Sequence, residues 1–161
     1  MRWTKVPGVN LCMEILSGSC RFGLWFVRVQ WNDTTVYGVR FSPTGVPGNV
    51  PGLIRQYCAG HVVSPEKLNS IATHEDTVYS RIYRAVQQVP YGSLTTYGEI
   101  AAIVGTSPRV VGQAMSRNPT PLVIPCHRVL AAHSIGGFSP EVAIKESLLA
   151  MEKKGLQKVK R

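Results

Sequence analysis

The chain has 161 residues, of which 44% are hydrophobic, and it carries a formal net charge of +9 at pH 7. A chain of about 150 residues buries about 70% of its unfolded surface, so a stable core needs neither a disulfide nor a metal scaffold. No stretch approaches the roughly 20 apolar residues of a membrane span, and the first ten residues lack the apolar core of a signal peptide. We therefore expect a globular cytoplasmic protein with no membrane partner.

The positive charge is concentrated in the second half of the chain. Residues 1–80 contain seven Lys or Arg against five Asp or Glu, whereas residues 81–161 contain eleven against four. A basic surface favours an anionic partner, although charge alone does not separate nucleic acid from a membrane surface or an acidic substrate. A polyanionic partner is expected to contact the C-terminal half.

The N-terminal half has the pattern of a β lobe. Residues 11–16, 22–31 and 35–41 are rich in β-branched and aromatic residues with partial alternation, which predicts an antiparallel meander. Residues 42–52 hold three prolines and three glycines and are predicted to form a loop, followed by a short helix at 53–59. We expect this lobe and its connecting segment to occupy residues 1–73.

From residue 74 onward the apolar period changes to that of helices. The first predicted helix has an apolar stripe and ends at Pro90; the stripe comprises Val78, Ile82, Ala85, Val86 and Val89. Thr96 with Glu99 predicts a capping box for a second helix at 97–104, which Gly105 closes.

A third helix is predicted to start with Ser107 as N-cap and Pro108 at the first helical position, and to end at Asn118. Two short helices joined by a tight turn with glycine indicate a helix-turn-helix. The fold class is therefore α+β, a small antiparallel β lobe followed by a mainly helical lobe over residues 74–161.

The last predicted helix starts at Ser139-Pro140-Glu141 and runs to Gly155. Its periodicity places Lys145, Leu148, Leu149 and Glu152 on one face. A carboxylate thus lies on an apolar stripe. A solvated charge near the helix end and a buried carboxylate remain alternative interpretations of Glu152.

Cys126 and His127 are the strongest candidates for chemistry. A free thiol has a pKa of about 8.5, so a nucleophilic cysteine benefits from a nearby base or cation. His127 could act as the base if a carboxylate held its other ring nitrogen, and Glu152 is the best candidate because residues 81–161 contain no Asp. Against this, an unpaired cysteine is usually a small buried hydrophobe, and neighbours on an extended segment point to opposite faces.

The other cysteines carry no clear signal. Cys12, Cys20 and Cys58 show no Cys-x-x-Cys spacing, so free thiols are expected, with a Cys12–Cys20 bridge as an unsupported alternative. Cys12, Cys20, His61 and His74 do not form a recognisable zinc-ligand pattern, so no metal is predicted.

Three segments of the C-terminal half together resemble one family. They are Gly-Ser-Leu-Thr-Thr-Tyr-Gly-Glu-Ile-Ala from Gly92, Pro-Arg-Val-Val-Gly-Gln-Ala-Met from Pro108, and Asn-Pro-Thr-Pro-Leu-Val-Ile-Pro-Cys-His-Arg-Val from Asn118. In order and spacing they are similar to the O6-alkylguanine-DNA alkyltransferase (methylated-DNA–protein-cysteine methyltransferase) family. The resemblance covers roughly residues 76–155, and the N-terminal lobe resembles the family only in general character.

The resemblance implies a single-turnover DNA repair protein that needs no cofactor, acts as a monomer and binds double-stranded DNA carrying O6-alkylguanine. Cys126 would accept the alkyl group, His127 would take its proton through a water, and Glu152 would orient His127. Tyr97 would give a proton to the departing guanine, and Asn118 would tie the recognition helix to the active-site segment. Arg109 would fill the gap left by the flipped base. The other implied DNA contacts are Pro108, Gly112, Gln113, Met115, Tyr97 and Arg128, and the implied substrate pocket contains Phe138, Ser139, Val129 and Lys145.

Two positions depart from the family pattern. Phe138 stands where the family usually has Tyr, and Pro140 replaces a residue that is usually Gly or Arg. Three other functions compete with this one. They are a non-enzymatic sensor of alkylated DNA, against which Cys126 argues; a cysteine hydrolase built on Cys126, His127 and Glu152; and a transcription regulator, for which the third helix carries few base-reading side chains.

Overall fold

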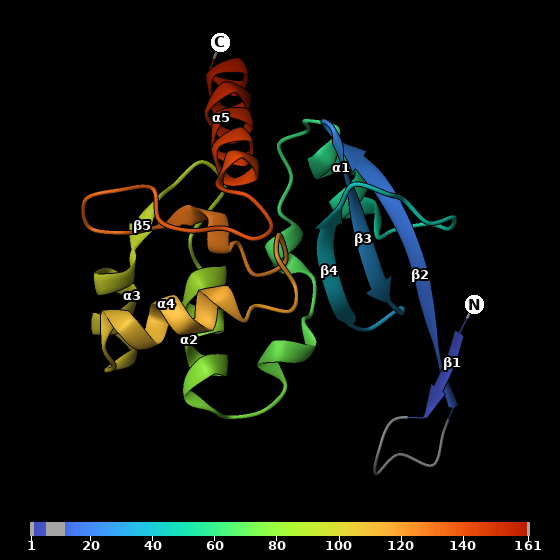
Figure 1. The fold of residues 1–161 in the computed structure, drawn as a ribbon, viewed down its shortest axis with the longest axis horizontal. Coiled ribbons are helices and arrows are strands. Elements are labelled where there is room, and N and C mark those ends of the chain that lie inside the picture. Colours follow the sequence, from blue (N-terminus) through green and yellow to red (C-terminus); the bar gives the residue numbers. More distant parts are fainter. Residues whose placement is uncertain (1, 6–11, 161) are drawn as a thin grey trace.

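The computed structural model describes residues 2–5 and 12–160, with side chains from residue 14 onward. The N-terminal part is a four-stranded sheet in the order β1-β2-β3-β4, with every neighbouring pair antiparallel (Figure 1). Its strands are β1 (Arg2–Lys5), β2 (Cys12–Phe22), β3 (Trp25–Trp31) and β4 (Val36–Ser42). The predicted antiparallel meander is confirmed, whereas β1 had no sequence prediction and Leu11 lies outside the described residues.

The prediction placed the start of the second strand wrongly. It began that strand at Phe22, but Phe22 ends β2 and pairs with Trp25 across a two-residue turn. Gly23 adopts a φ of 59°, a left-handed conformation that glycine adopts without strain and that reverses the chain here. Cys12 and Cys20 both lie on β2, eight residues and about 26 Å apart. They cannot form a disulfide, which needs Cα atoms within about 7 Å, and Cys20 is a free thiol.

The inner face of the sheet packs against α1 (Gly52–Cys58) and against the C-terminal half of the chain. Val27, Val29 and Phe41 point into one hydrophobic core together with Ile54 of α1. That core also contains Leu122, Val123, Ile144 and Leu148. The two lobes therefore share a core and are not packed as independent units.

The helical lobe follows two short 3-10 turns, η1 (Pro65–Lys67) and η2 (Ile71–Thr73). It consists of α2 (Val78–Gln87), α3 (Tyr97–Val104) and α4 (Pro108–Ser116), which surround a second core. The helix-turn-helix formed by α3 and α4 is confirmed, since Gly105 closes α3 in a left-handed conformation and the Ser107 side chain caps α4.

The predicted capping box at Thr96 is only half present. The Thr96 hydroxyl accepts from the backbone N–H of Glu99, but the Glu99 carboxylate accepts from Thr95 Oγ1 at 2.9 Å instead of turning back to the cap. A complete, unpredicted capping box opens α2, where Thr77 and Ser80 bond reciprocally.

Two short strands connect the helical lobe to the segment that contains Cys126 and His127. β5 (Thr95–Thr96) pairs in parallel with β6 (Val129–Leu130), and η3 (Cys126–Arg128) precedes β6 directly. The pairing places Tyr97, the first residue of α3, beside the segment that carries Cys126.

The last helix, α5 (Val142–Val159), was predicted with both ends misplaced. It begins after Glu141 because Ser139 belongs to a loop that lines a cavity. It also continues past Gly155, whose missing side chain makes room for a neighbour: a Cβ there would lie 2.5 Å from Tyr91 Oη. None of the helices in the described part of the chain is long and apolar enough to cross a membrane.

Candidate active site

Cys126 lies at the first position of η3 and lines a cavity of about 350 Å³. Its side chain is almost fully enclosed, with 7% of the residue exposed. The wall brings together α3, α4, the turn after α4 and the loop before α5. The lining residues are Tyr97, Gly112, Met115, Ser116, Asn118, Pro121, Cys126, Gly137, Phe138 and Ser139.

Helix α4 contributes to both the cavity and the surface. Gly112 and Met115, predicted as DNA contacts, line the cavity. Pro108, Arg109 and Gln113 are exposed on the same helix. A Cβ built on Gly112 meets nothing within 4 Å, so the glycine leaves this side of the cavity open.

The turn between α4 and Cys126 is held by Asn118. Its Nδ2 donates to the carbonyl of Ile124 at 2.9 Å, and its Oδ1 accepts from the backbone N–H of Thr120 at 3.0 Å. The buried Leu122 inside this turn has a φ of 74°, a left-handed conformation that costs a non-glycine residue about 1–3 kcal/mol. The Asn118 contacts join the end of α4 to the active-site segment, as the resemblance implied.

His127 is buried behind Cys126 and is held by Glu152 of α5. The Nε2 atom of His127 lies 2.5 Å from Glu152 Oε2, and both side chains are 1% exposed. The Nδ1 atom of His127 is also buried and makes no hydrogen bond within the described residues. Glu152 is therefore a buried carboxylate, and its interpretation as a solvated charge near the helix end is wrong.

Two further side chains contact Glu152, whose Oε1 also accepts from the backbone N–H of Gly92 at 2.8 Å. Tyr57 Oη donates to Glu152 Oε2 at 2.5 Å and lies 3.1 Å from His127 Nε2. Arg128 Nε donates to Glu152 Oε1 at 3.0 Å, and Arg128 also pairs with Glu66 at 3.3 Å. Sequence reasoning missed Tyr57, because nothing local connects α1 with residues so far along the chain.

The network sets the protonation of its members. Burial would raise the pKa of Glu152, but hydrogen bonds from His127 and Arg128 and the charge of Arg128 outweigh it and bring that pKa to about 2. Burial lowers the pKa of His127 despite the opposing effect of Glu152, so the imidazole is neutral at pH 7. A neutral imidazole whose Nε2–H donates to Glu152 carries its lone pair on Nδ1, the form that can accept a proton.

Burial also raises the pKa of the Cys126 thiol, against smaller lowering effects of Asn118 and Lys145. The nearby cation Lys145 therefore does not give this cysteine a low pKa. A buried thiol in this state needs a base to become a nucleophile.

Three predicted site residues lie elsewhere. Arg128, expected to contact DNA, is fully buried by its pairs with Glu152 and Glu66 and cannot reach a phosphate. Val129 packs its side chain into the helical core and does not line the cavity. Lys145 is fully buried behind the wall, where its Nζ donates to the carbonyls of Val129 at 2.7 Å and Gly137 at 3.3 Å.

The remaining predicted pocket residues do line the cavity. Tyr97 is half-buried and lies beside Gly136, where an added Cβ would come within 2.9 Å of Tyr97 Oη. Phe138 packs edge-on against Phe41 of β4, with ring centroids 5.7 Å apart. The aromatic ring at this departure from the family pattern thus connects the cavity loop to the N-terminal sheet. Among residues 14–160, whose side chains the structure describes, no group of three His, Cys, Asp or Glu is arranged to hold a metal ion.

The comparisons with known proteins agree with this arrangement. Residues 77–154 match the family model described as 6-O-methylguanine DNA methyltransferase, DNA binding domain. This part of the chain is similar to the O6-alkylguanine-DNA alkyltransferase family. The matched region contains α2 to α4, the Asn118 turn, Cys126, His127 and Glu152, so the family resemblance predicted from the sequence is confirmed.

Relatives in this family are similar over the same half. The chain is 51% identical over 72 residues to a methylated-DNA–protein-cysteine methyltransferase of Metallosphaera sedula, covering 45% of this chain and 46% of that protein. It is 49% identical over 71 residues to the protein of that name from Saccharolobus solfataricus, covering 44% and 47%. The alignment thus spans about half the length of these curated relatives.

Solved structures show that the likeness in fold extends to the N-terminal sheet. The O6-methylguanine methyltransferase of Mycobacterium tuberculosis superposes with a TM-score of 0.70 at 24% identity, over 88% of this chain and 94% of that one. The O6-methylguanine-DNA methyltransferase of Pyrococcus kodakaraensis gives a TM-score of 0.65 at 24% identity, over 84% and 97%. The α+β alkyltransferase fold is therefore confirmed for most of the chain.

Proposed function

We propose that this protein repairs DNA by moving the alkyl group from O6 of a flipped guanine to Cys126, once per molecule. The observation that carries the proposal is the position of Cys126 in a cavity bordered by α4, directly before a buried His127–Glu152 pair. A cavity that opens beside a helix-turn-helix suits a base that has left the duplex. The basic C-terminal half and the family match support DNA as the partner.

The proposed reaction needs one base and one acid. The Cys126 thiol gives its proton to His127 Nδ1, through a water as the resemblance implies, while Glu152 stabilises the imidazolium that results. The sulfur then forms a bond to the alkyl carbon as the bond between that carbon and O6 breaks. The hydroxyl of Tyr97, which lines the cavity, supplies a proton to the departing guanine and is later reprotonated. The product is a thioether, which water does not cleave, so turnover ends.

DNA binding is proposed to use the exposed face of α4. Extruding a base costs a few kcal/mol, and an inserted side chain can offset that cost by filling the gap in the stack. Arg109 is exposed at the start of α4 and is the proposed side chain. Minor-groove contacts of this kind read sequence weakly, which suits a protein that must find lesions anywhere.

The organisation of the chain follows the same proposal. We place the division between the β lobe with its connecting segment and the helical acceptor region at residues 73 and 74, although the two share a core. A monomer in the cytoplasm is proposed because the family resemblance implies it.

The test is the intact mass of the protein after incubation with an oligonucleotide containing O6-methylguanine. We expect one added methyl group, mapped to Cys126, and no more than one lesion repaired per protein molecule. Cys126→Ser is the control and is expected to gain nothing. Repeated turnover would indicate a hydrolase, and binding of the alkylated oligonucleotide without a mass change would indicate a sensor; either result overturns the proposal.

A further inference from the structure

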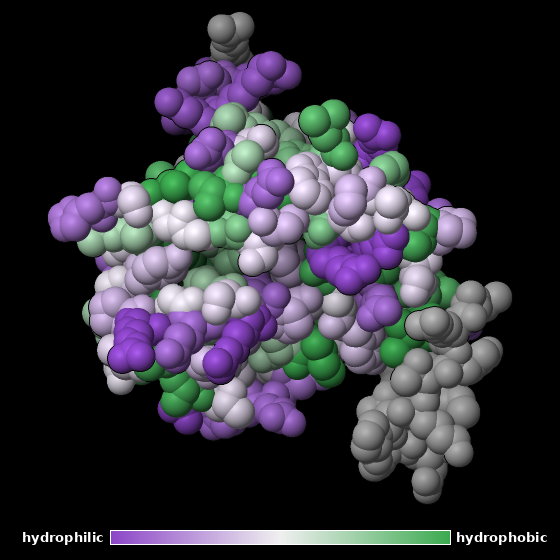
Figure 2. All heavy atoms as spheres, viewed as in Figure 1, coloured by the Kyte–Doolittle hydropathy of each residue, from purple (hydrophilic) through white to green (hydrophobic). Residues whose placement is uncertain are grey.

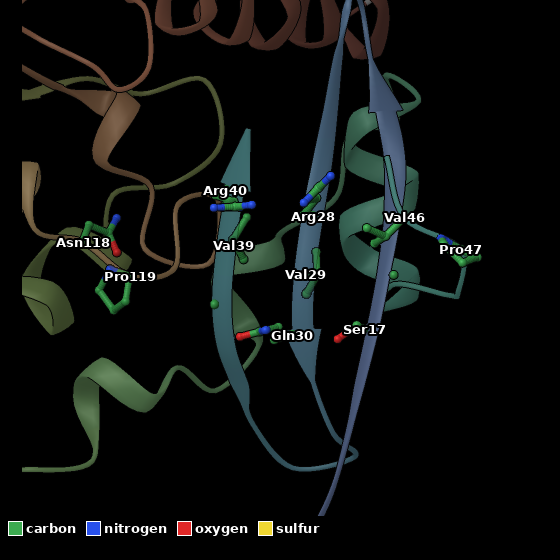
Figure 3. Close-up of a pocket in the computed structure, with 12 residues that line it drawn as sticks. Ser17, Arg28, Val29, Gln30, Val39, Arg40, Val46, Pro47, Asn118 and Pro119 are labelled. Carbon is green, nitrogen blue, oxygen red and sulfur yellow. The ribbon is translucent and has the colours of Figure 1, made fainter. Parts of the chain in front are cut away.

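A second and larger hollow lies on the outer face of the N-terminal sheet. It has a volume of about 810 Å³, and we call it the sheet trough (Figure 3). Its floor is formed by β3 and β4, including Gln30 and Gly38, which adds no side chain to the floor. One wall is Val46-Pro47, in the loop after β4, and the other is Asn118-Pro119, in the turn after α4.

Two arginines dominate the floor of the sheet trough. Arg28 of β3 and Arg40 of β4 are directly opposite each other in the antiparallel register. Like charges in directly opposed positions repel and destabilise a sheet, unless an opposite charge lies between them. No Asp or Glu lines the sheet trough among the described residues.

The two guanidinium groups are held differently. Arg28 Nε donates to the carbonyl of Thr44 at 2.9 Å and its NH2 donates to Thr44 Oγ1 at 2.7 Å, so its position is fixed. Arg40 is exposed and makes no hydrogen bond or ion pair within the described part of the chain. Figure 3 shows both side chains at the same level of neighbouring strands, where one anionic group could contact both.

The sheet trough adjoins the cavity of Cys126. Asn118 lines both hollows, and the backbone N–H of Val39 donates to the carbonyl of Pro119 at 2.9 Å, so that β4 and the active-site turn are fixed to each other. Hydrophilic residues gather over β3 and β4 and again over α4 on one face of the molecule (Figure 2). A strand entering the cavity beside α4 could continue across Asn118 into the sheet trough.

We propose that the sheet trough binds the sugar-phosphate backbone of the DNA strand flanking the flipped nucleotide, with Arg28 and Arg40 contacting its phosphates. This inference rests on the proposed function and deepens it, because it gives the N-terminal lobe a direct part in holding the substrate. Phosphate is the fitting ligand because arginine presents several donors to its oxygens, and because a backbone contact is independent of base sequence. Gln30 and Ser17 offer neutral hydrogen bonds along the same floor.

The experiment measures the affinity for duplex DNA containing O6-methylguanine as a function of salt, using the full chain with Cys126→Ser so that no transfer occurs. Each phosphate contact adds about 0.9 to the slope of log Kd against log salt, so R28Q/R40Q is expected to lower that slope by about 2. Between about 50 and about 200 mM salt, the ratio of the wild-type DNA affinity to that of the double variant should fall about ten-fold.

Two further variants keep the result interpretable. R40Q alone removes no internal hydrogen bond of the described residues and is expected to lower the slope by about 1. R55Q changes the same charge on α1, outside the sheet trough, and is the matched control with an unchanged slope. Shortening the duplex from the end that reaches the sheet trough should weaken DNA binding by the protein with both arginines. It should not change the DNA affinity of R28Q/R40Q.

The outcomes separate this inference from the proposed function. With Cys126 intact, R28Q/R40Q is expected to accept a methyl group. Its methyl transfer should be slower than that of the wild type only at low protein concentrations, where DNA binding limits the rate. If the wild type accepts the alkyl group but R28Q/R40Q and R40Q keep the wild-type slope, the trough proposal is wrong and the repair function stands. If the variants change only self-association or the binding of an acidic peptide, the trough serves a protein partner and the proposal is also overturned. Failure of the wild type to accept any alkyl group would instead remove the proposed function.

Discussion

Tyr57 Oη lies 3.1 Å from His127 Nε2, although 70 residues separate them in sequence, and it donates to the carboxylate of Glu152. The contact joins α1 of the N-terminal lobe to the proposed base of the reaction. The N-terminal lobe is thus more than a scaffold at this point, because it supplies one of the hydrogen bonds that fix the carboxylate on which His127 depends.

Tyr57→Phe is expected to keep the packing of the ring and lose the hydroxyl. A hydrogen bond to a charged group contributes about 1.5–3 kcal/mol, so the free energy of unfolding in urea should fall by about that amount. Alkyl transfer should slow several-fold while DNA affinity stays unchanged, because the residue acts through Glu152. Tyr37→Phe, which removes a hydroxyl of β4 that accepts from Asn32, is the control. Equal effects of the two changes would mean that Tyr57 has only a packing role.

Glu152→Gln is expected to slow methyl transfer with little change in DNA affinity. The change removes the negative charge beside His127 and replaces one acceptor oxygen by an NH2 donor, and it leaves the buried Arg128 with Glu66 as its ion-pair partner. Breaking a buried ion pair costs about 3–5 kcal/mol, so the unfolding midpoint should also fall. The exposed Glu146 on the same helix provides the matched control, Glu146→Gln. Wild-type transfer kinetics in Glu152→Gln would show that the carboxylate does not support the base.

Acid should destabilise the protein in two steps. Burial in the folded state lowers the pKa of His127. When the pH falls below the unfolded pKa of about 6.5, the unfolded chain binds a proton more readily than the folded chain, and the free energy of unfolding decreases. Glu152 has a pKa of about 2 in the folded state, so its stabilising contribution is complete above the ordinary carboxyl range and is lost as the pH falls toward about 2. Urea unfolding from pH 7 down to pH 3 checks this, with Glu152→Gln expected to be flatter below about pH 4.5.

The rate of transfer should hold well below the ordinary pKa of histidine. His127 must be neutral to accept the thiol proton, and its lowered pKa keeps it neutral at mildly acidic pH. We expect single-turnover rates to decline only at a pH below the ordinary histidine pKa of about 6.5. A decline centred at or above about pH 6.5 would show that burial does not control the imidazole.

Arg109→Ala is expected to weaken repair of duplex DNA more than reaction with the free alkylated base. The side chain is exposed on α4 and is proposed to occupy the gap in the stack, a contact that the free base does not need. Comparing the second-order rates on the two substrates measures this. Arg81→Ala, on α2 and paired with Asp76, controls for loss of charge. Equal losses on both substrates would refute the gap-filling role.

Sequence reasoning succeeded where the signal is local. Ser107 and Pro108 specify the start of α4 by capping chemistry alone, and the capped helix is present. The buried position of Glu152 followed as one of two alternatives from helical periodicity and the absence of Asp in residues 81–161.

The sequence predictions were wrong or silent at residues whose position depends on contacts with residues far away in the sequence. Arg128 was expected to contact DNA because the family resemblance implied it, but ion pairs with Glu152 and Glu66 hold it in the interior. Gly155 looked like a helix end, whereas Tyr91 needs the space that a side chain would fill. Tyr57 carried no motif at all, since its role exists only once α1 packs against α5.

The hydrogen bond from Val39 to Pro119 has a consequence for solubility. β4 is the last strand of its sheet, and a bare strand of this kind recruits strands from other molecules. Val39 and Val36 instead donate to Pro119 and Asn69 of the same chain. The turn that precedes Cys126 therefore also covers the edge of the sheet. A variant that opens this turn is expected to aggregate as well as to lose the proposed alkyl transfer.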